Sequence, residues 1–234
     1  MEHYNDKIPV LFTTYNRIEY TRQALPVLLE NTDIGHIFIY DNGSEDGTQE
    51  WLNEGEYIRP DRPEPVLCLA DRNTGVGGAM NWFFNQTQGY KWVAKVDNDT
   101  MVPEGWLTEL VTIAEKHLID IIQANHHFKI RDFKTWEDLE ERSVHVIHND
   151  KGSIVKWHLV GGSGVLINRE RITEHIDTST LLNGWSVFQS KHPELNKALY
   201  NGVWVDLLDM EDNAKRADGV DTEYYKSIGR DGEC

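Results

Sequence analysis

Short apolar runs alternate with longer amphipathic stretches through the first half of the chain. The apolar runs are rich in β-branched and aromatic residues, as buried strands are, and they cover residues 8–13, 36–40, 66–70, 92–96 and 119–124. The stretches between them mix polar and apolar positions at helical spacing, over residues 17–30, 44–52, 75–88 and 103–117. Strands that alternate with helices predict an α/β fold with a mostly parallel central sheet and flanking helices.

Three residues define these helices more closely. Pro26 lies inside the first helix and is expected to kink or split it, because proline removes a backbone donor. Ser44 is predicted to cap the start of the second helix. Pro103 is predicted to occupy the first turn of the fourth helix, where the missing N–H costs no hydrogen bond.

The pattern changes in the second half, near Arg131. Two strand-like runs flank the polar turn Asn149-Asp150-Lys151-Gly152, which predicts a hairpin. The elements predicted in this half are strands over 143–148, 154–157, 165–168 and 203–207, and helices from Arg169 and over 193–199. We interpret the chain as one domain, with a first half over 1–125 and a smaller, antiparallel second half over 126–234.

Polar clusters follow each of the first four predicted strands. They are Thr14-Tyr15-Asn16-Arg17, Asp41-Asn42, Asp71-Arg72-Asn73 and Asp97-Asn98-Asp99. Because the carboxyl ends of parallel strands meet at one edge of a sheet, these clusters are expected to lie together, where ligands of such sheets bind. The sequence therefore predicts a ligand site at this edge.

Asp97-Asn98-Asp99 points to the chemistry of that site. Two carboxylates at i and i+2 of an extended chain lie on the same side of the backbone. Mg²⁺ and Mn²⁺ are typically held by one or two such carboxylates together with the oxygens of a bound phosphate or diphosphate. An ordinary Asp/Asn turn is the alternative explanation for the triplet taken alone.

Composition restricts the class of partner. The chain has 234 residues and a formal net charge of −16, which disfavours binding to nucleic acid backbones and anionic membranes. Its two cysteines, Cys68 and Cys234, cannot form a disulfide framework and favour a reducing cytoplasm. The polar N-terminus lacks the pattern of a signal peptide, and no apolar run approaches the length of a membrane span. We therefore expect a soluble, cytoplasmic protein without a membrane span.

Together these motifs resemble the family 2 glycosyltransferases with the GT-A fold. The matching segments occur in the family's order. They are the first strand and its Tyr-Asn-Arg turn (9–17), the pattern from Asp41 to Thr48, the segment from Asn73 to Asn81, and Asp97-Asn98-Asp99 at the position of the family's D-x-D. Residues 161–169 are similar to the family's acceptor-side strand.

The resemblance implies a metal-dependent, inverting transfer of a sugar from a nucleoside diphosphate sugar. It implies that Tyr15 or its neighbours pack on the nucleobase and that Asp41 accepts a hydrogen bond from a base N–H, which favours UDP- or dTDP-sugars. Asp97 would contact the ribose or the metal, Asp99 would bind the metal, which is Mn²⁺ or Mg²⁺, and the glycine-rich helix start would admit the ligand closely. The donor-binding residues implied are Thr13, Tyr15, Arg17, Asp41, Asn42, Asn73, Gly77, Gly78, Asp97 and Asn98.

The acceptor side departs from the family pattern. Many members supply a general base from a Glu-Asp pair that follows the strand similar to residues 161–169. In about that place this chain has Leu182-Asn183-Gly184-Trp185-Ser186. Asp206 and Asp209 follow the last predicted strand and are the candidate bases, or further metal ligands. Gly162 and Trp185 are the candidate acceptor-side residues, with a core position for Trp185 as the alternative.

Two other functions remain open at this stage. A non-catalytic sugar-nucleotide binding module would explain the missing acid pair, while the intact acidic triplet opposes it. A sugar nucleotidyltransferase would need a glycine-rich loop with Arg and Lys near the first strand, and Thr13 to Arg17 is not such a loop. The acceptor can be a saccharide, a protein or a modified nucleobase.

Overall fold

A computed structural model describes residues 7–126, 135–179 and 184–208 of the chain. The helices of these residues are α1 (Ile18–Glu30), α2 (Thr48–Glu54), α3 (Gly75–Gln86), α4 (Trp106–His117), α5 (Trp136–Arg142) and α6 (Gly184–Lys191). The strands are β1 (Ile8–Thr14), β2 (Ile34–Asp41), β3 (Val66–Leu69), β4 (Trp92–Asp97), β5 (Thr100–Met101), β6 (Ile121–His126), β7 (Val146–His148), β8 (Ser153–Lys156), β9 (Val165–Asn168) and β10 (Lys197–Leu207).

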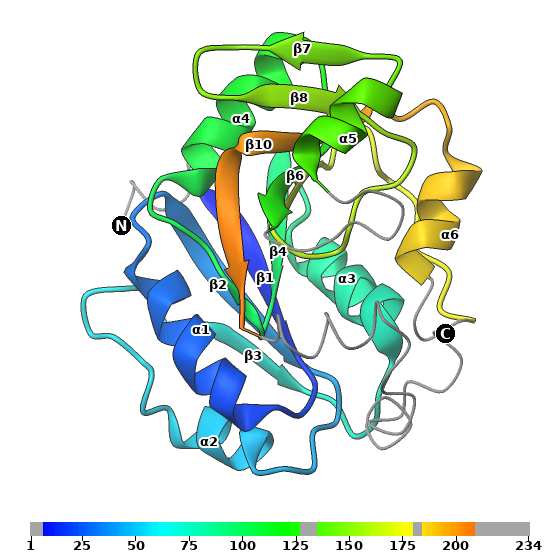
Figure 1. The fold of residues 1–234 in the computed structure, drawn as a ribbon. Coiled ribbons are helices and arrows are strands. Elements are labelled where there is room, and N and C mark those ends of the chain that lie inside the picture. Colours follow the sequence, from blue (N-terminus) through cyan, green and yellow to red (C-terminus); the bar gives the residue numbers. More distant parts are fainter. Residues whose placement is uncertain (1–6, 127–134, 180–183, 209–234) are drawn as a thin grey trace, which may run out of the picture.

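One sheet holds these strands in the order β3-β2-β1-β4-β9-β6-β10-β8-β7, and β5 pairs with β10 (Figure 1). The pairs β3–β2, β2–β1 and β1–β4 are parallel, as predicted for the first half. β9 runs antiparallel between β4 and β6, and β10, β8 and β7 continue the sheet with antiparallel pairs β10–β8 and β8–β7. The predicted α/β class, with a parallel centre and an antiparallel second region, is confirmed.

Helices cover both faces of this sheet. On β1, Val10 and Phe12 pack in one buried cluster with α1, α2 and α4, whereas Leu11 packs in the other cluster with α3, α5 and α6. Neighbouring strand residues point to opposite faces, so a sheet that is buried on both sides needs apolar residues at consecutive positions. This is why the central strands read as unbroken apolar runs.

Two predicted helix starts are wrong, whereas the first helix differs from its prediction only in part: Pro26 does not split it, and α1 continues through this residue to Glu30. Ser44 does not cap α2, whose N-cap position is Gly47, because the Ser44 hydroxyl instead bonds within the preceding loop. α4 begins at Trp106, after Gly105 at a φ of 76°, and so starts later than Pro103.

The second half was predicted less well. The hairpin β7–β8 is confirmed, but residues 193–199 do not form a helix, because Lys197 already begins β10 between β6 and β8. Residues 169–179 are also not helical. The Asn81 side chain holds the chain there, since its Oδ1 accepts from the Ile176 N–H and its Nδ2 donates to the Ile176 carbonyl, both at 2.8 Å.

Candidate functional site

The carboxyl ends of β1, β2 and β4 meet at one edge of the sheet. The Asn42 N–H donates to the Thr14 carbonyl at 2.8 Å, and the Asn98 N–H donates to the Thr13 carbonyl at 3.0 Å. The three polar segments that follow these strands are thus tied to one another by their backbones, as the sequence predicts for ligand-binding loops.

Asp97 lies at the centre of this edge. Its Oδ1 accepts hydrogen bonds from the Thr13 hydroxyl and the Lys95 ammonium, and its backbone N–H donates to Ser163 Oγ at 2.9 Å. The Asp97 side chain is 36% exposed, and Oδ1 takes both of its hydrogen bonds within the described part of the chain. Oδ2 therefore remains available to a ligand.

Lys95 is a site residue that the sequence analysis did not identify. Its side chain is 1% exposed, and its Nζ donates to Asp97 and, at 2.7 Å, to the Gly162 carbonyl. A buried charge of this kind needs a partner and full hydrogen bonding. The available signal was a lysine at i−2 from Asp97 in an apolar strand, which places both side chains on the same face.

Asp99 is paired with Arg17. Arg17 Nη1 donates to Asp99 Oδ2 at 3.0 Å, and the Thr100 hydroxyl donates to Asp99 Oδ1 at 3.2 Å. The two charged side chains are 9% and 18% exposed, respectively. The ion pair is therefore partly shielded from water, and it is stronger than a pair at the open surface.

Arg17 is placed by an unusual turn. Asn16 and Arg17 have φ values of 54° and 61°, the left-handed region that non-glycine residues rarely adopt. Three contacts hold Asn16 there: its N–H donates to Ser44 Oγ at 2.7 Å, its Oδ1 accepts from the Glu45 N–H at 2.9 Å, and its carbonyl accepts from Asn98 Nδ2 at 2.9 Å. Strain of this kind clusters at functional sites.

Asp41 is completely buried, and its hydrogen bonds organise the loop after β2. Its Oδ1 accepts from the N–H groups of Gly43 and Ser44 and from Gln49 Nε2, at 3.0, 2.8 and 2.6 Å, and its Oδ2 accepts from the Ser44 hydroxyl. With four donors already bound, the carboxylate reaches a nucleobase only after this loop rearranges. Its base-edge role stays a prediction.

The other predicted donor residues on this side also make internal contacts. Asn42 Oδ1 accepts from the Thr74 N–H and hydroxyl at 3.2 and 3.0 Å, and Asn73 Oδ1 accepts from the Gly75 N–H at 2.8 Å. Asn98 is buried, with its amide on Asn16 and Thr21. Tyr15 is half-buried directly after β1, and its packing on a base stays a prediction.

Gly77 and Gly78 both lie close to other parts of the chain, while their contact with a ligand stays a prediction. A Cβ at Gly77 would lie 3.1 Å from the Asp177 carbonyl, and one at Gly78 would lie 2.3 Å from Thr74 Oγ1. Both glycines therefore allow close packing within the protein.

The acceptor-side residues separate into a buried and an exposed group. Trp185 is 4% exposed, donates from Nε1 to the Gly161 carbonyl at 3.1 Å and stacks on Phe188. Such a buried indole is a core residue, and in this structure it offers no open face to an acceptor. Gly162 lies between the side chains of Lys95 and Trp185. A Cβ at this position would be 3.8 Å from Lys95 Nζ and 3.9 Å from Trp185 Cδ1.

Asp206 and Trp204 form the exposed group. In β10, Asp206 pairs with Met101 of β5, and the Leu208 N–H donates to the Asp99 carbonyl at 2.7 Å. The end of β10 is therefore fixed beside Asp99. Trp204, which was not predicted as a site residue, shares the exposed side of β10 with Asp206 and is 40% exposed. Asp209 lies outside the described residues.

Asp97 and Asp99 are the residues of this edge suited to a divalent cation. Asp97 ends β4 and Asp99 lies in the turn that follows, and within the described ranges no group of three or more His, Cys, Asp or Glu side chains forms a fuller cage. A site with one or two carboxylates suits Mg²⁺ or Mn²⁺ when phosphate oxygens complete the coordination.

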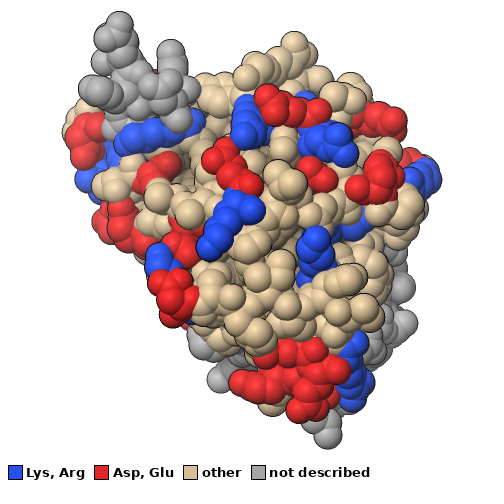
Figure 2. All heavy atoms as spheres, turned by 90° about the horizontal axis from the view of Figure 1, so that it is seen from above, with Lys and Arg blue, Asp and Glu red and all other residues tan. Residues whose placement is uncertain are grey.

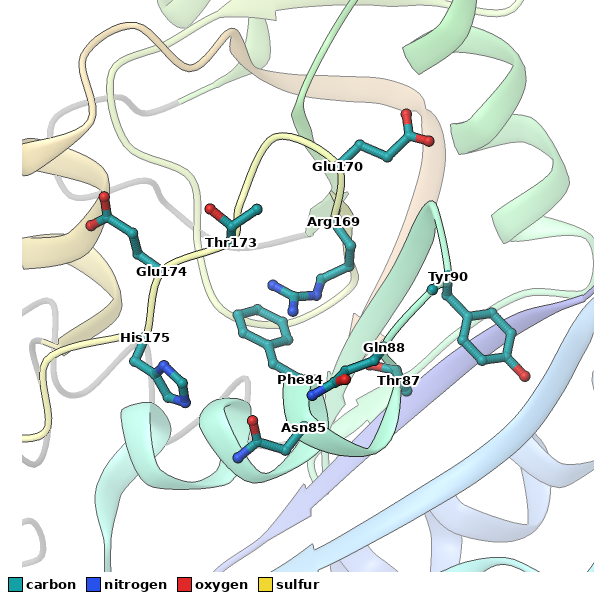
Figure 3. Close-up of a pocket in the computed structure, with 11 residues that line it drawn as sticks. Phe84, Asn85, Thr87, Gln88, Tyr90, Arg169, Glu170, Thr173, Glu174 and His175 are labelled. Atoms are coloured by element: carbon teal, nitrogen blue, oxygen red, sulfur yellow. The ribbon is translucent and has the colours of Figure 1, made fainter.

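Two surface features lie apart from this edge. A hollow with a volume of about 430 Å³ lies beside Arg169, whose guanidinium carbon is 3.8 Å from the Phe84 ring centroid. Figure 3 shows the residues that line it. Its lining includes Tyr90, just before β4, and none of the predicted site residues. On the face in Figure 2, basic and acidic side chains are interspersed, without the extended basic surface that binds a nucleic acid backbone.

Comparison with known families assigns the chain. The sequence model of the family "Glycosyl transferase family 2" matches residues 10–174. This chain belongs to that family. The matched range includes the turn after β1, Asp97-Asn98-Asp99 and residues 161–169. A search of curated protein sequences gave no match.

Solved structures of glycosyltransferases share the GT-A fold of this family 2 member. They include S. aureus TarS 1-349 (TM-score 0.60, 13% identity, 89% of this chain and 62% of that one). A second is GalNAc-T7 with UDP, GalNAc and Mn²⁺ (TM-score 0.63, 12% identity, 86% of this chain and 43% of that one). A third is the Pyrobaculum calidifontis mannosyltransferase PcManGT with GDP-Man and Mn²⁺ (TM-score 0.63, 16% identity, 97% of this chain and 65% of that one). The chain spans less than two thirds of each of these proteins. In the described ranges no helix is long and apolar enough to cross a bilayer.

Proposed function

We propose that this family 2 protein transfers a sugar from a nucleoside diphosphate sugar to an acceptor hydroxyl, with a divalent cation and with inversion at the sugar. The observation that carries the proposal is the edge where Asp97 and Asp99 lie beside the turns after β1 and β2. Two of the similar structures hold Mn²⁺ with a nucleotide or nucleotide sugar, which supports the same class of ligand here.

The donor diphosphate is proposed to lie against Asp97 and Asp99, with Mn²⁺ or Mg²⁺ between. When bound, the cation would neutralise the charge that grows on the diphosphate as the glycosidic bond breaks. Lys95 fixes Oδ1 of Asp97, so that Oδ2 faces the ligand. Tyr15 is proposed to pack on the base. A uracil or thymine base, and thus a UDP- or dTDP-sugar, stays our preferred donor.

Asp206 is proposed as the general base. The acceptor oxygen attacks the anomeric carbon, the bond from that carbon to the diphosphate oxygen breaks, and the hydroxyl proton passes to the Asp206 carboxylate. β10 holds this residue beside the strand end that carries Asp99. Trp204 shares its exposed side and is proposed as the aromatic surface on which the acceptor lies.

The alternatives fit less well. A nucleotidyltransferase lacks its glycine-rich triphosphate loop after β1, where this chain instead has the turn at Asn16 and Arg17. A non-catalytic binding module would have no need of a general base, the role proposed for Asp206. The two cysteines support a reducing, cytoplasmic compartment for the enzyme.

The test is turnover of candidate donors in the presence of Mn²⁺, followed as release of the nucleoside diphosphate. The wild-type protein should hydrolyse or transfer at least one UDP- or dTDP-sugar. Asp99→Asn should lose this activity, whereas the control Asp150→Asn, in the exposed β7–β8 turn, should keep it. Undiminished release by the Asp99 variant would refute the proposal.

A further inference from the structure

We infer that Arg17 is a displaceable counter-ion, which occupies Asp99 until a cation and a diphosphate arrive together and which then pairs with the diphosphate. This inference rests on the proposed function, because it takes Asp99 as a metal ligand. It adds a role for Arg17 in coupling the two ligands, so that neither the metal nor the donor binds strongly without the other.

The first ground is the different surroundings of the two acids. Lys95, at 1% exposure, is enclosed and holds Asp97 together with the Gly162 carbonyl, so this ion pair is a permanent part of the fold. Arg17 Nη1 lies 3.0 Å from Asp99 Oδ2, and the side chains of this pair are 9% and 18% exposed, so that the cation of Asp99 is more open to water than Lys95. Asp99 is thus the acid whose cation can leave.

The second ground is electrostatic. A divalent cation on Asp99 needs a carboxylate oxygen at roughly 2.1 Å, yet Oδ2 is held by Arg17 and Oδ1 by the Thr100 hydroxyl. A guanidinium and a divalent cation on the same carboxylate repel each other. Metal binding therefore competes with the Arg17 ion pair, and this competition weakens binding of the metal alone.

The third ground is what lies within reach of the displaced side chain. A diphosphate held together with a metal at Asp99 would bring phosphate oxygens close to the Arg17 guanidinium, which lies 3.0 Å from Asp99 Oδ2. The planar guanidinium matches phosphate geometry. The left-handed turn at Asn16 and Arg17 is held by Ser44, Glu45 and Asn98, so the backbone stays in place while the side chain moves.

Loss of Arg17 should change the affinities for the metal and for the nucleotide in opposite directions, which general damage to the fold would not do. Loss of the Arg17 side chain should tighten binding of Mn²⁺ alone, because its competitor is gone, and weaken binding of UDP in the presence of Mn²⁺. Because coupling between two ligands is reciprocal, the gain in metal affinity caused by UDP should fall in the variant. A variant that merely loosens the fold would weaken both.

The experiment measures Mn²⁺ affinity by calorimetry or by the electron paramagnetic resonance of free Mn²⁺, first without nucleotide and then with UDP. Arg17→Ala should bind Mn²⁺ alone about ten- to a hundredfold more tightly than the wild type, the scale of one charged hydrogen bond. The control Arg22→Ala, an exposed arginine of α1 paired with Glu19 at 3.9 Å, should leave this affinity unchanged.

A second variant shows whether Asp99 carries the effect. In Arg17→Ala with Asp99→Asn, the gain in Mn²⁺ affinity should vanish. If the wild type binds Mn²⁺ through Asp99 but Arg17→Ala binds it no more tightly, the inference is overturned while the proposed metal site stands. If neither protein binds Mn²⁺, both fail together. A gain that survives the loss of Asp99 also overturns the inference.

Discussion

The ammonium of Lys95 donates to Oδ1 of Asp97 from inside the sheet, at a side-chain exposure of 1% for the lysine and 36% for the aspartate. The two partners of this ion pair thus differ in their access to water. Water can hydrate Asp97 if its partner is removed, whereas it cannot reach Lys95. The pair anchors the acidic triplet to β4 and, through the Gly162 carbonyl, to the acceptor-side strand.

This asymmetry predicts unequal effects on stability. Asp97→Ala leaves an enclosed ammonium without a counter-ion and should lower the free energy of unfolding by about 3 kcal/mol. Lys95→Met removes the buried charge and leaves an acid that water reaches, so its cost should be about 1 kcal/mol. Urea denaturation of the two variants tests the order. A larger loss for Lys95→Met would show that this explanation of the pair is wrong.

Ser44 should be important to the turn that holds Arg17. Ser44→Ala removes the acceptor of the Asn16 N–H and one donor to Asp41, both buried or partly buried. We expect a loss of about 2 kcal/mol in the free energy of unfolding, together with weaker nucleotide binding. Ser190→Ala removes an exposed hydroxyl on α6 and is the matched control, expected near zero. Equal effects of the two variants would contradict the prediction.

The two tryptophans of the second half should respond differently to truncation. Trp185→Ala opens a cavity under α6 and should lower the free energy of unfolding by about 3 to 5 kcal/mol. Trp204, 40% exposed, should tolerate Trp204→Ala with a loss of about 1 kcal/mol. If Trp204 is the acceptor surface, its variant should retain donor hydrolysis and lose transfer to the acceptor. Retained transfer would assign the acceptor elsewhere.

Asp206→Asn should separate chemistry from binding. The amide cannot take the acceptor proton, so kcat should fall by a factor of about 100 or more. Donor affinity, measured by calorimetry with Mn²⁺, should stay within about twofold of the wild type because Asp97 and Asp99 are unchanged. A variant that keeps full kcat would remove Asp206 from the mechanism.

Tyr200 gives stability a dependence on alkaline pH. Burial raises its pKa to about 12, and its hydroxyl donates to Glu109 at 2.9 Å. Because the folded pKa lies above the unfolded value of 10.0, this contribution is complete below pH 10 and is lost as the pH rises towards 12. The stability difference between wild type and Tyr200→Phe should shrink by about 2 to 3 kcal/mol over that interval, measured by urea denaturation. A constant difference would contradict this.

The sequence predicted the parallel half of the sheet well, because its strands are buried on both faces and its loops carry chemistry at one edge. It predicted the second half poorly. Ile172 and Ile176 have helical spacing, yet the Asn81 side chain holds Ile176 in a non-helical chain. β10 crosses an Asn-Gly pair with a shifted register, and only its neighbours β6 and β8 define it as a strand.

The candidate site shows the same division. The acids and the turns could be placed from strand ends alone. Lys95 shares a strand face with Asp97 by its spacing, but its ion pair with Asp97, like that of Arg17 with Asp99, depends on side-chain packing that the motifs do not show. The burial of Asp41 and Trp185 likewise depends on the packing of neighbouring elements, and motif patterns carry no information on it.

The most direct test of the central claim is a thermal-shift screen of UDP-, dTDP- and GDP-sugars, with and without Mn²⁺, on the wild type and on Asp99→Asn. A ligand that binds only the native state raises the melting temperature according to its concentration and affinity. We predict the largest shift for a UDP- or dTDP-sugar with Mn²⁺, a small shift without the metal, and no metal-dependent gain in the variant. Equal shifts with and without Mn²⁺, or an undiminished gain in Asp99→Asn, would contradict the claim that Asp97 and Asp99 form a metal–diphosphate site.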